Sequence, residues 1–316
     1  MASDEESRDG SGRPIEAVIC IPTFRRPDWL ARTIPSVAGQ ETPFGFAIVV
    51  IDNDSANPVG ADCAHALLSA TDIPHRIGVE AQQGNCHAIN RAFTDAMAAY
   101  PAAEFFLMID DDEIAMPGWL ANIVELARRQ EADIVGGPVI REFEAPTPDA
   151  VRQHPLFQSI DGSTRAVSQI YGSGNCLIRR RVFESLPSPP FDRRFNFLGG
   201  GDMEFFTRCR KAGFTSWWCS EAEIHEFVPA ERTTARFLTT RSIRTGSINY
   251  TIDRLHGTAA HVLAKNVASL GLSVFRSLAL FASTRDLLPA SHPFLMSVGR
   301  ITASFNVLPQ PYKASD

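Results

Sequence analysis

The sequence predicts an α/β fold with a mostly parallel central sheet, and three observations support that prediction. From Ile15 onward, apolar segments of strand length alternate with helical segments of ten or more residues, which is typical of right-handed β-α-β units. The apolar run Phe105 to Ile109 leads directly into four acids, Asp110 to Glu113. Clustered carboxylates cannot enter a core unpaired, so the strand must end there, at the sheet edge where open α/β sheets bind ligands. Residues 251–316 have helical periodicity and predict a C-terminal helical extension.

Composition limits the class of protein. The chain has 316 residues, 44% of them hydrophobic and 21% charged, which is enough for one large α/β domain, expected over residues 15–250. A net charge of −6 argues against a nucleic-acid partner, because phosphate contacts need a basic surface. The six cysteines show no zinc-like spacing and suggest a cytoplasmic protein with reduced thiols. Residues 1–14 are polar and acid-rich, so they resemble neither a signal peptide nor a membrane span, and we expect them to be disordered.

The individual elements follow from apolar periodicity and from helix start signals such as Pro27. We predict strands at 17–21, 46–51, 76–79, 105–109 and 134–139, and helices at 27–38, 59–69, 85–99 and from 117 to about 129. Residues 141–170 have weak periodicity and are interpreted as a long excursion or a lid. Ordered structure is predicted to resume with 171–178, a helix at 202–212, a strand at 214–219 and a helix from about 231.

The C-terminal extension contains one apolar stripe at helical spacing. Its members are Leu263, Val267, Leu270, Val274, Leu278 and Phe281. Arg276 interrupts the apolar run well short of the ~20 residues that a membrane span needs. Two interpretations remain: a helix docked on the catalytic domain, or a helix lying in a membrane interface. A second apolar segment, 294–305, carries Arg300 and has the same two interpretations.

Oxygen ligands gathered at Asp110 to Glu113 suit Mg²⁺ or Mn²⁺, which one or two carboxylates and substrate phosphates commonly hold. The alternative is a solvated turn before the helix that Pro117 opens. Polar residues also follow the first two strands, in Pro22-Thr23-Phe24-Arg25 and in Asp52-Asn53. They are candidates for contacts with a nucleotide, although turn chemistry alone favours Asp and Asn.

Three further segments carry candidate residues. Asn85 begins a helix directly after a glycine. This helix start either approaches a ligand closely or is a plain helix N-cap. Asp202 follows three glycines, more than a helix cap requires, so we interpret it as a general base. His225 is a lone histidine that is either structural or an additional metal ligand. Arg241 and Arg244 belong to an arginine run that is either a solvated face or suited to a diphosphate.

Taken in order, five motifs resemble family 2 of the inverting glycosyltransferases, which have the GT-A fold. They are Pro-Thr-Phe-Arg, Val-Val-Ile-Asp-Asn-Asp-Ser, Gly-Asn-Cys-His-Ala-Ile-Asn, Ile-Asp-Asp-Asp-Glu and Gly-Gly-Gly-Asp-Met-Glu-Phe-Phe-Thr-Arg, and the resemblance covers about Ile15 to Tyr250. Within the family, the later His-Glu-Phe-Val-Pro-Ala-Glu-Arg and Arg-x-x-Arg-x-Gly runs are most similar to bacterial exopolysaccharide glucosyltransferases of the succinoglycan-assembly type.

The resemblance assigns Pro22, Thr23, Asp52 and Asn53 to the nucleotide, Asp111 to the ribose or the metal, Asp112 to the metal, Mn²⁺ or Mg²⁺, and Asp202 to the base. We add further candidates: Arg25, Asn85 and Asp110 for the nucleotide, His225 for the metal, Gly174, Asn175, Gly201 and Glu204 for the sugars, and Arg241 and Arg244 for the diphosphate. Gly201 departs from the family pattern, which commonly has Glu before this Asp.

The implied partners are a nucleotide-sugar donor, in first place UDP-glucose, and a saccharide acceptor linked to a polyprenyl diphosphate. The implied location is the cytoplasm, with peripheral attachment to the inner face of the plasma membrane. Two other functions remain open from the residues alone: a nucleotidyltransferase, and a non-catalytic protein that binds sugar nucleotides or carbohydrates. A nucleotidyltransferase would need a basic phosphate-binding loop early in the chain, for which Arg25-Arg26 is the only candidate.

Overall fold

The computed structural model describes residues 8–10, 12–160 and 162–307, which form two compact units. The first unit takes its described residues from 1–140, 162–196 and 201–226, and the second takes them from 141–161, 197–200 and 227–316. This division differs from the predicted boundary at residue 250, because the chain passes into the second unit three times. Residues 1–7 of the segment expected to be disordered lie outside the description, and Arg8 and Pro14 form an isolated bridge.

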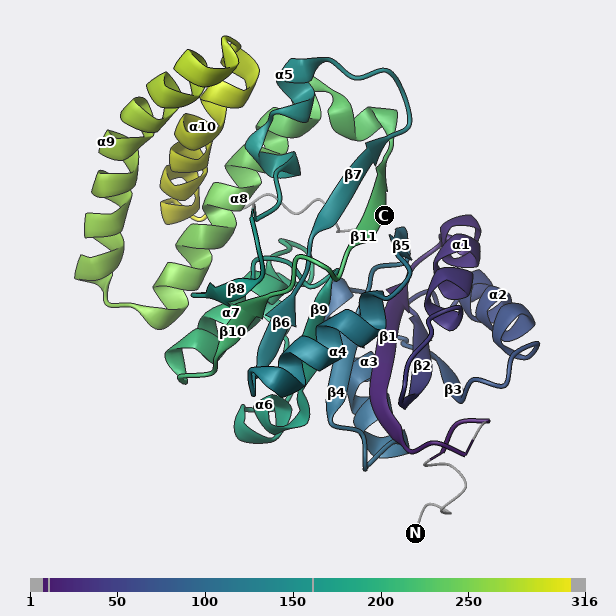
Figure 1. Ribbon diagram of the computed structural model, residues 1–316. Coiled ribbons are helices and arrows are strands. Elements are labelled where there is room, and N and C mark those ends of the chain that lie inside the picture. Colours follow the sequence, from purple (N-terminus) through teal and green to yellow (C-terminus); the bar gives the residue numbers. More distant parts are fainter. Residues whose placement is uncertain (1–7, 11, 161, 308–316) are drawn as a thin grey trace. The chain divides into compact units, whose positions relative to one another are not determined.

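An eight-stranded mixed sheet forms the centre of the first unit (Figure 1). In spatial order its strands are β3 (His75–Val79), β2 (Gly45–Asp52), β1 (Ile15–Thr23), β4 (Phe105–Met108), β9 (Cys176–Arg179), β6 (Ile134–Gly136), β10 (Ser216–Trp218) and β8 (Arg165–Val167). The first four of these strands pair in parallel, as the alternating sequence predicts. β9 runs antiparallel to both β4 and β6, which the sequence does not predict.

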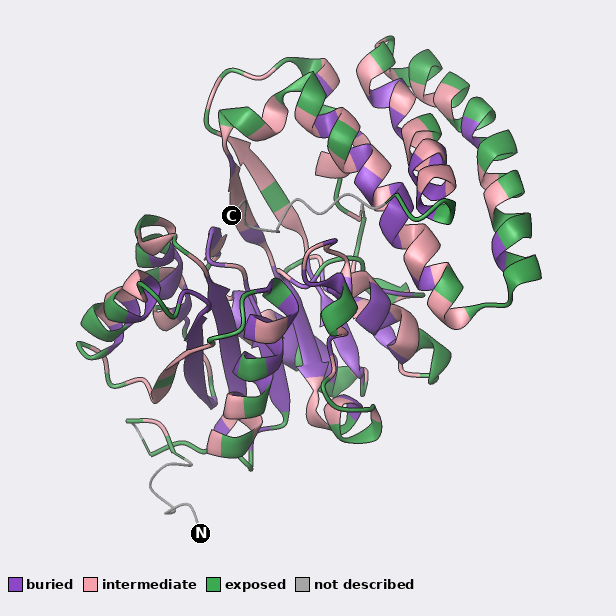
Figure 2. Ribbon diagram, turned by 180° about the vertical axis from the view of Figure 1, so that it is seen from behind, coloured by how far each residue is buried: buried purple, intermediate pink, exposed green. Residues whose placement is uncertain are grey.

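Helices cover both faces of the sheet, so the central strands are buried on both sides and consist almost entirely of apolar residues (Figure 2). One face shares a core with α1 (Pro27–Ala38), α2 (Val59–Leu68) and α4 (Trp119–Arg129). The other face packs through phenylalanine rings on α3 (Asn85–Ala99), α6 (Arg180–Ser185) and α7 (Gly201–Lys211). In that group the Phe183 ring lies 4.7 Å from Phe93 and 5.9 Å from Phe106 of β4.

A smaller sheet contains β5 (Glu113–Ala115), β11 (Ile224–Val228) and β7 (Val139–Phe143), in the order β5-β11-β7. Both β7 and β11 begin in the first unit and continue into the second. The short elements are α5 (Asp149–Arg152) and three 3₁₀ turns, η1 (Pro155–Phe157), η2 (Arg193–Phe195) and η3 (Ala230–Thr233). The strand predicted at 134–139 is thus two strands, β6 and β7, separated by Gly137-Pro138, where the proline cannot donate to a ladder.

The second unit is mainly helical and contains α8 (Ala235–His256), α9 (Ala259–Thr284) and α10 (Leu287–Ser304). Thr258 and Asp286 cap α9 and α10 by accepting hydrogen bonds from backbone N–H groups in the first turn. Glycine allows α8 and α10 to approach closely. A Cβ at Gly246 would collide with the backbone of Met296, and a Cβ at Gly299 would collide with the backbone of Ile243.

An ordinary docked helix buries its apolar face and exposes its polar face, and α9 has the reverse arrangement. Its inner face toward α10 is polar: Ser273 is buried, Ser269 and Ser297 hydroxyls lie 3.0 Å apart, and Arg300 Nε donates to Asn266 Oδ1 at 3.0 Å. The residues of the predicted apolar stripe are exposed by between 40% and 66%, and much of this helix is coloured as exposed in Figure 2. Within the described residues, α9 is the one helix long and apolar enough to cross a membrane by length and composition. The stripe is therefore not part of the protein core.

Candidate active site

The predicted site residues meet at the carboxyl ends of three neighbouring parallel strands. Thr23, the last residue of β1, lies opposite Asp52 at the end of β2. Cys20 of β1 lies opposite Met108 of β4, and Ile109 N donates to Cys20 O at 3.3 Å. Asp110 to Asp112 therefore emerge at the edge that the sequence predicts, where ligands bind in open α/β sheets.

Two residues of the loop after β1 hold the acids that follow β4. Thr23 Oγ1 donates to Asp111 Oδ2 at 2.7 Å. One terminal nitrogen of Arg26 donates to Asp111 Oδ1 at 3.2 Å and to Asp112 Oδ2 at 2.8 Å. Both carboxylates are buried, whereas the Arg26 side chain is 41% exposed. Arg26 was not predicted as a residue of this site, whereas its neighbour Arg25 was predicted to contact the nucleotide. The one local signal was the position of Arg26 in the polar loop directly after a buried strand.

The acid cluster carries more negative charge than Arg26 alone can balance. Burial, together with the charges of Asp112 and Asp111, raises the pKa of Asp110 to about 8. Glu113 accepts a hydrogen bond from Asp110 N at 2.8 Å, and burial with the nearby Asp110 and Glu226 raises its pKa well above the usual range. Glu226 contributes because it lies directly opposite Glu113 in the β5–β11 pair. A bound cation would relieve this repulsion.

The residues present suit a hard divalent ion only in part. No group of three or more histidine, cysteine or acidic side chains within the described ranges is arranged to hold a metal. Mg²⁺ and Mn²⁺ sites in nucleotide-dependent enzymes often have one or two carboxylates, with phosphates and water completing the shell. Asp112 supplies such a carboxylate, in an acidic surrounding that favours a cation. His225 Nε2 lies 2.7 Å from Glu223 Oε1. The residue of β11 whose charge acts on Asp110 and Glu113 is Glu226, which follows His225.

Asp202 lies at the second position of α7 and is half-buried. Its charge contributes to raising the pKa of Asp110, which indicates that the carboxylate lies near the acid cluster. Gly201 sets this position, because a Cβ there would come within 2.6 Å of Cys86 Sγ on α3. Glu204, two residues further along α7, accepts from Arg208 Nε with both oxygens, at 2.8 and 3.0 Å, and is buried.

Asp52 and Asn53 make their described hydrogen bonds to the protein backbone. Asp52 Oδ2 accepts from the backbone N–H groups of Gly60 and Ala61 at 2.8 and 3.0 Å, at the start of α2. Asn53 Nδ2 donates to the carbonyls of Glu80 and Gln82, while its Oδ1 accepts from Gly84 N at 2.8 Å. Asn53 therefore fixes the loop that leads into α3.

The other predicted nucleotide contacts are spread over the same edge. Pro22 is buried in β1, beside Thr23. Arg25 is exposed and donates to Asp54 Oδ2 at 2.5 Å. Asn85 is exposed at the first position of α3. Of this group, Arg25 and Asn85 present the most accessible polar atoms for a ligand.

The two predicted sugar contacts before β9 differ in their surroundings. A Cβ at Gly174 would collide with the carboxylate of Glu113, so glycine is needed for the acid cluster to pack. Asn175 is buried; its Oδ1 accepts from Trp119 Nε1 at 2.8 Å and its Nδ2 donates to two backbone carbonyls. Arg241 and Arg244 lie on α8, in the second unit, where Arg244 is buried.

Comparison with known proteins agrees with this arrangement. The family model described as glycosyl transferase family 2 matches residues 18–186. The succinoglycan biosynthesis protein ExoM of Rhizobium meliloti is 30% identical over 264 residues, which cover 81% of this chain and 80% of that protein. Among solved structures, the mannosyltransferase PcManGT from Pyrobaculum calidifontis, in complex with GDP-Man and Mn²⁺, has a TM-score of 0.61 at 15% identity, covering 95% of this chain and 90% of that one. S. aureus TarS 1-349 in complex with UDP has a TM-score of 0.51 at 11% identity and covers 92% of each chain.

The fold and the acidic sheet edge define a GT-A glycosyltransferase. The chain belongs to glycosyltransferase family 2, as its motif order indicates. Family membership favours this activity over both a nucleotidyltransferase and a non-catalytic sugar-nucleotide-binding protein.

Proposed function

We propose that the protein transfers a sugar from a nucleoside diphosphate sugar, in first place UDP-glucose, to a saccharide acceptor during the assembly of a bacterial exopolysaccharide. The observation that carries the proposal is the convergence of Thr23, Asp111 and Asp112 at one sheet edge, with Arg26 bridging the two carboxylates. The relation to a succinoglycan biosynthesis protein supports the pathway class, and the nucleotides bound by the two solved structures support the donor class.

Asp112 would hold the divalent ion, with His225 as a second candidate. When bound, Mg²⁺ or Mn²⁺ supplies Lewis-acid neutralisation of the charge that develops on the diphosphate. Thr23, Arg25, Asn85 and Asp111 orient the nucleotide. Burial and the neighbouring carboxylates raise the pKa of Asp110 to about 8 and that of Glu113 above its usual range, and protonation of Asp110 would limit the negative charge near the donor.

Asp202 acts as the general base in this proposal. It accepts the proton of the acceptor hydroxyl while the oxygen bonds to the anomeric carbon, and the bond from that carbon to the diphosphate breaks on the opposite side. One displacement with one base inverts the configuration, unlike the two-step retaining route through a carboxylate nucleophile. Asp202 is half-buried and its Oδ1 accepts from the neighbouring Met203 N at 2.8 Å, whereas both oxygens of Glu204 accept from Arg208 within the helix.

Two variants separate binding from chemistry. Asp202→Asn should retain UDP-glucose affinity and lose transfer by roughly 10²- to 10⁴-fold, because a general base matters only once the acceptor is attacked. Asp112→Asn should lose the Mn²⁺-dependent part of donor binding. Donor affinity is measured by calorimetry with and without Mn²⁺, and transfer by UDP release with acceptor. Near-normal transfer by Asp202→Asn would move the base elsewhere, and unchanged Mn²⁺-dependent binding by Asp112→Asn would remove the metal assignment.

We further propose that α9 lies in the interface of an anionic membrane and that the acceptor saccharide is carried on a polyprenyl diphosphate. The outward stripe of α9 is apolar, and Phe275 beside it is 72% exposed. From residue 253 to 307 the chain has five arginine or lysine residues against two aspartates, and Lys265 and Arg300 both pair with Asp253, although the whole protein has a net charge of −6. Because the inner face of α9 is hydrogen-bonded to α10, the helix would lie along a surface instead of crossing it. Each basic residue near an anionic surface adds about 1 kcal/mol.

The membrane proposal is tested by co-sedimentation with vesicles. The full chain should sediment with phosphatidylglycerol-containing vesicles, and Val267→Asp with Phe275→Asp should abolish this while the protein remains folded, since both side chains are exposed. Ala212→Asp, which adds the same type of charge at an exposed position at the end of α7, is the matched control and should sediment normally. If the wild type does not sediment with the vesicles and instead dimerises through the apolar stripe, the stripe binds a second copy of the chain and the proposal fails.

A further inference from the structure

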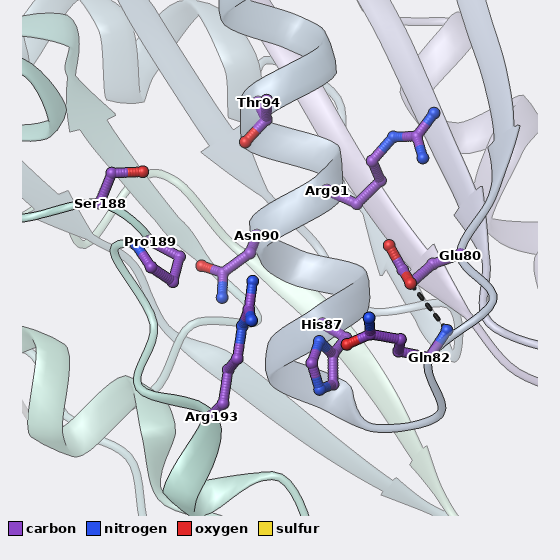
Figure 3. A pocket seen from close by; sticks show the side chains of 9 residues that line it. All are labelled: Glu80, Gln82, His87, Asn90, Arg91, Thr94, Ser188, Pro189 and Arg193. Carbon is purple, nitrogen blue, oxygen red and sulfur yellow. Dashed lines mark hydrogen bonds between the residues drawn. The ribbon is translucent and has the colours of Figure 1, made fainter.

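A cavity of about 250 Å³ lies beside α3, apart from the acid cluster (Figure 3). Its walls come from three segments of the first unit: the β3–α3 loop, one face of α3, and the loop before η2. The lining residues are Glu80, Gln82, His87, Asn90, Arg91, Thr94, Ser188, Pro189 and Arg193. The volume is slightly below the roughly 300 Å³ at which small-molecule sites usually begin, which suits a single sugar ring.

The lining is almost entirely polar. Apart from Pro189, every side chain carries a hydrogen-bonding group, and the set combines hydroxyls, amides, cations and one carboxylate. Apolar ligands would leave these groups unpaired at a cost, whereas a hydroxylated ligand can satisfy them. The chemistry of the cavity therefore favours a carbohydrate.

Some of these polar groups are already committed to the protein. Asn90 Nδ2 donates to Phe191 O and its Oδ1 accepts from Phe191 N, both at 2.8 Å. Arg91 Nε donates to both oxygens of Asp95, at 2.8 and 2.7 Å. Glu80 Oε1 accepts from Gln82 N at 2.7 Å. These bonds fix the walls, because Asn90 ties the loop before η2 to α3.

Two side chains that can donate hydrogen bonds, His87 and Arg193, remain available in the cavity. Throughout the described part of the chain, neither the His87 ring nor the Arg193 guanidinium has a hydrogen-bond or ion-pair partner, and the Arg193 guanidinium extends toward Asn90 and His87 (Figure 3). Burial and the nearby Arg193 lower the pKa of His87, while Glu80 opposes this effect. The Arg193 guanidinium therefore supplies the positive charge for an anion, and the His87 ring supplies an N–H donor beside it.

The cavity is adjacent to the proposed base in the fold. Cys86, which precedes His87 on α3, packs against Gly201 at the start of α7, and Asp202 follows. The loop that carries Arg193 continues through η2 to Asn196, which packs against Gly84 at the start of α3. The helix that lines the cavity thus also packs against the segment that carries Asp202, and an acceptor saccharide that reaches both would pass the N-terminal end of α3.

We propose that this cavity is an acceptor subsite for a sugar that carries a carboxylate or a phosphate group, bound by Arg193 and His87. The proposal rests on the glycosyltransferase function above, since the ligand is part of the acceptor. Arg193 supplies two parallel N–H donors for the oxyanion, His87 supplies one more, and the hydroxyls of Thr94 and Ser188 suit the sugar ring.

The test measures binding without donor, so that its failure is distinguishable from failure of the transfer function. Saturation-transfer NMR is recorded with D-glucuronate, glucose 1-phosphate, glucose and inorganic phosphate. Glucuronate and glucose 1-phosphate should bind, and glucose should bind at least tenfold more weakly. Arg193→Gln should weaken both anionic sugars at least tenfold, because a charge-assisted bond is lost. Arg194→Gln, an exposed neighbour paired with Asp192, should bind as the wild type does.

Three outcomes would overturn the proposal. Equal binding of glucuronate by the wild type and by Arg193→Gln would remove Arg193 from the site. Equal affinity for glucose would remove the requirement for an anion. Binding of inorganic phosphate alone would leave a simple anion site without a sugar. Because the Arg193 side chain is exposed, loss of folding in Arg193→Gln is not expected, and the thermal midpoint of each variant checks this.

Discussion

Replacing Arg26 tests whether this side chain is the resident counter-ion of the acid cluster. In Arg26→Gln, Asp111 and Asp112 lose a partner at 3.2 and 2.8 Å while remaining buried. Breaking a fully buried pair costs about 3–5 kcal/mol and an exposed pair about 0–1 kcal/mol. The Arg26 side chain is 41% exposed, so we expect an intermediate loss of about 2 kcal/mol without metal. This corresponds to a fall of roughly 4–8 °C in the thermal midpoint.

The same variant should bind Mn²⁺ more tightly. In the wild type a cation must compete with Arg26 for Asp112, and in Arg26→Gln this competing contact is absent. A difference of about 2 kcal/mol corresponds to a 10- to 30-fold lower Mn²⁺ concentration at half-maximal stabilisation. Scanning fluorimetry over a Mn²⁺ titration, without nucleotide, measures both quantities. Arg25→Gln is the control, because Arg25 pairs with Asp54 instead, and it should change neither. An unchanged midpoint, or a weaker response to Mn²⁺ than in the wild type, would refute the counter-ion role.

Three further predictions concern stability. His154 and His292 are buried side by side, 5.2 Å between ring centroids, and burial lowers the pKa of each to about 4. Well above pH 6.5 both histidines are neutral in the folded and in the unfolded protein. As the pH falls from 6.5 toward 4, the unfolded chain binds protons first, so the free energy of unfolding should fall by up to about 2.7 kcal/mol per pH unit. In urea unfolding, His292→Gln should halve this slope. Asp52→Ala should lose about 2–4 kcal/mol in denaturant unfolding, because three backbone N–H groups lose their acceptor; a loss below 1 kcal/mol would contradict its role at α2. Asp253→Asn should lower the free energy of unfolding by about 3 kcal/mol, because the buried Arg300 loses its carboxylate partner. Lys265→Gln removes the exposed partner of the same aspartate and should lower it by less than about 1 kcal/mol. Equal losses in the two variants would contradict this difference.

Local signals were sufficient for much of the fold. The helix predicted from Pro27 has its observed bounds at Pro27–Ala38, because proline at the first turn and an apolar period both act within the helix itself. The position of the acids also followed from the sequence, since charged residues cannot continue a buried strand. The antiparallel placement of β9 between β4 and β6 did not follow, because strand pairing depends on partners about 40 to 70 residues away.

The sequence predicted which residues lie at the site better than it predicted the hydrogen bonds between them. Thr23 and Asp111 were recognised as neighbours of a ligand, but their hydrogen bond to each other and the bridge from Arg26 exist only once β1 and β4 are adjacent. Asp52 and Asn53 show the same limit, since turn residues that bind backbone and turn residues that bind nucleotides look alike in sequence. For α9, periodicity identified which residues share a face, whereas the direction of that face depends on the polar residues of α10.

The discontinuous second unit also affects the order in which the protein is made. Residues 141–161 leave the ribosome almost 100 residues before α8 is complete, a delay of roughly 5–20 s at ordinary rates of synthesis. Ser269 and Asn266 of α9 are synthesised before their hydrogen-bond partners on α10, Ser297 and Arg300, which are 28 and 34 residues further along the chain. During that interval α9 has its complete apolar face but lacks the partners of its polar face. If α9 binds a lipid surface as proposed, the nascent chain would be able to bind it before the helical unit closes.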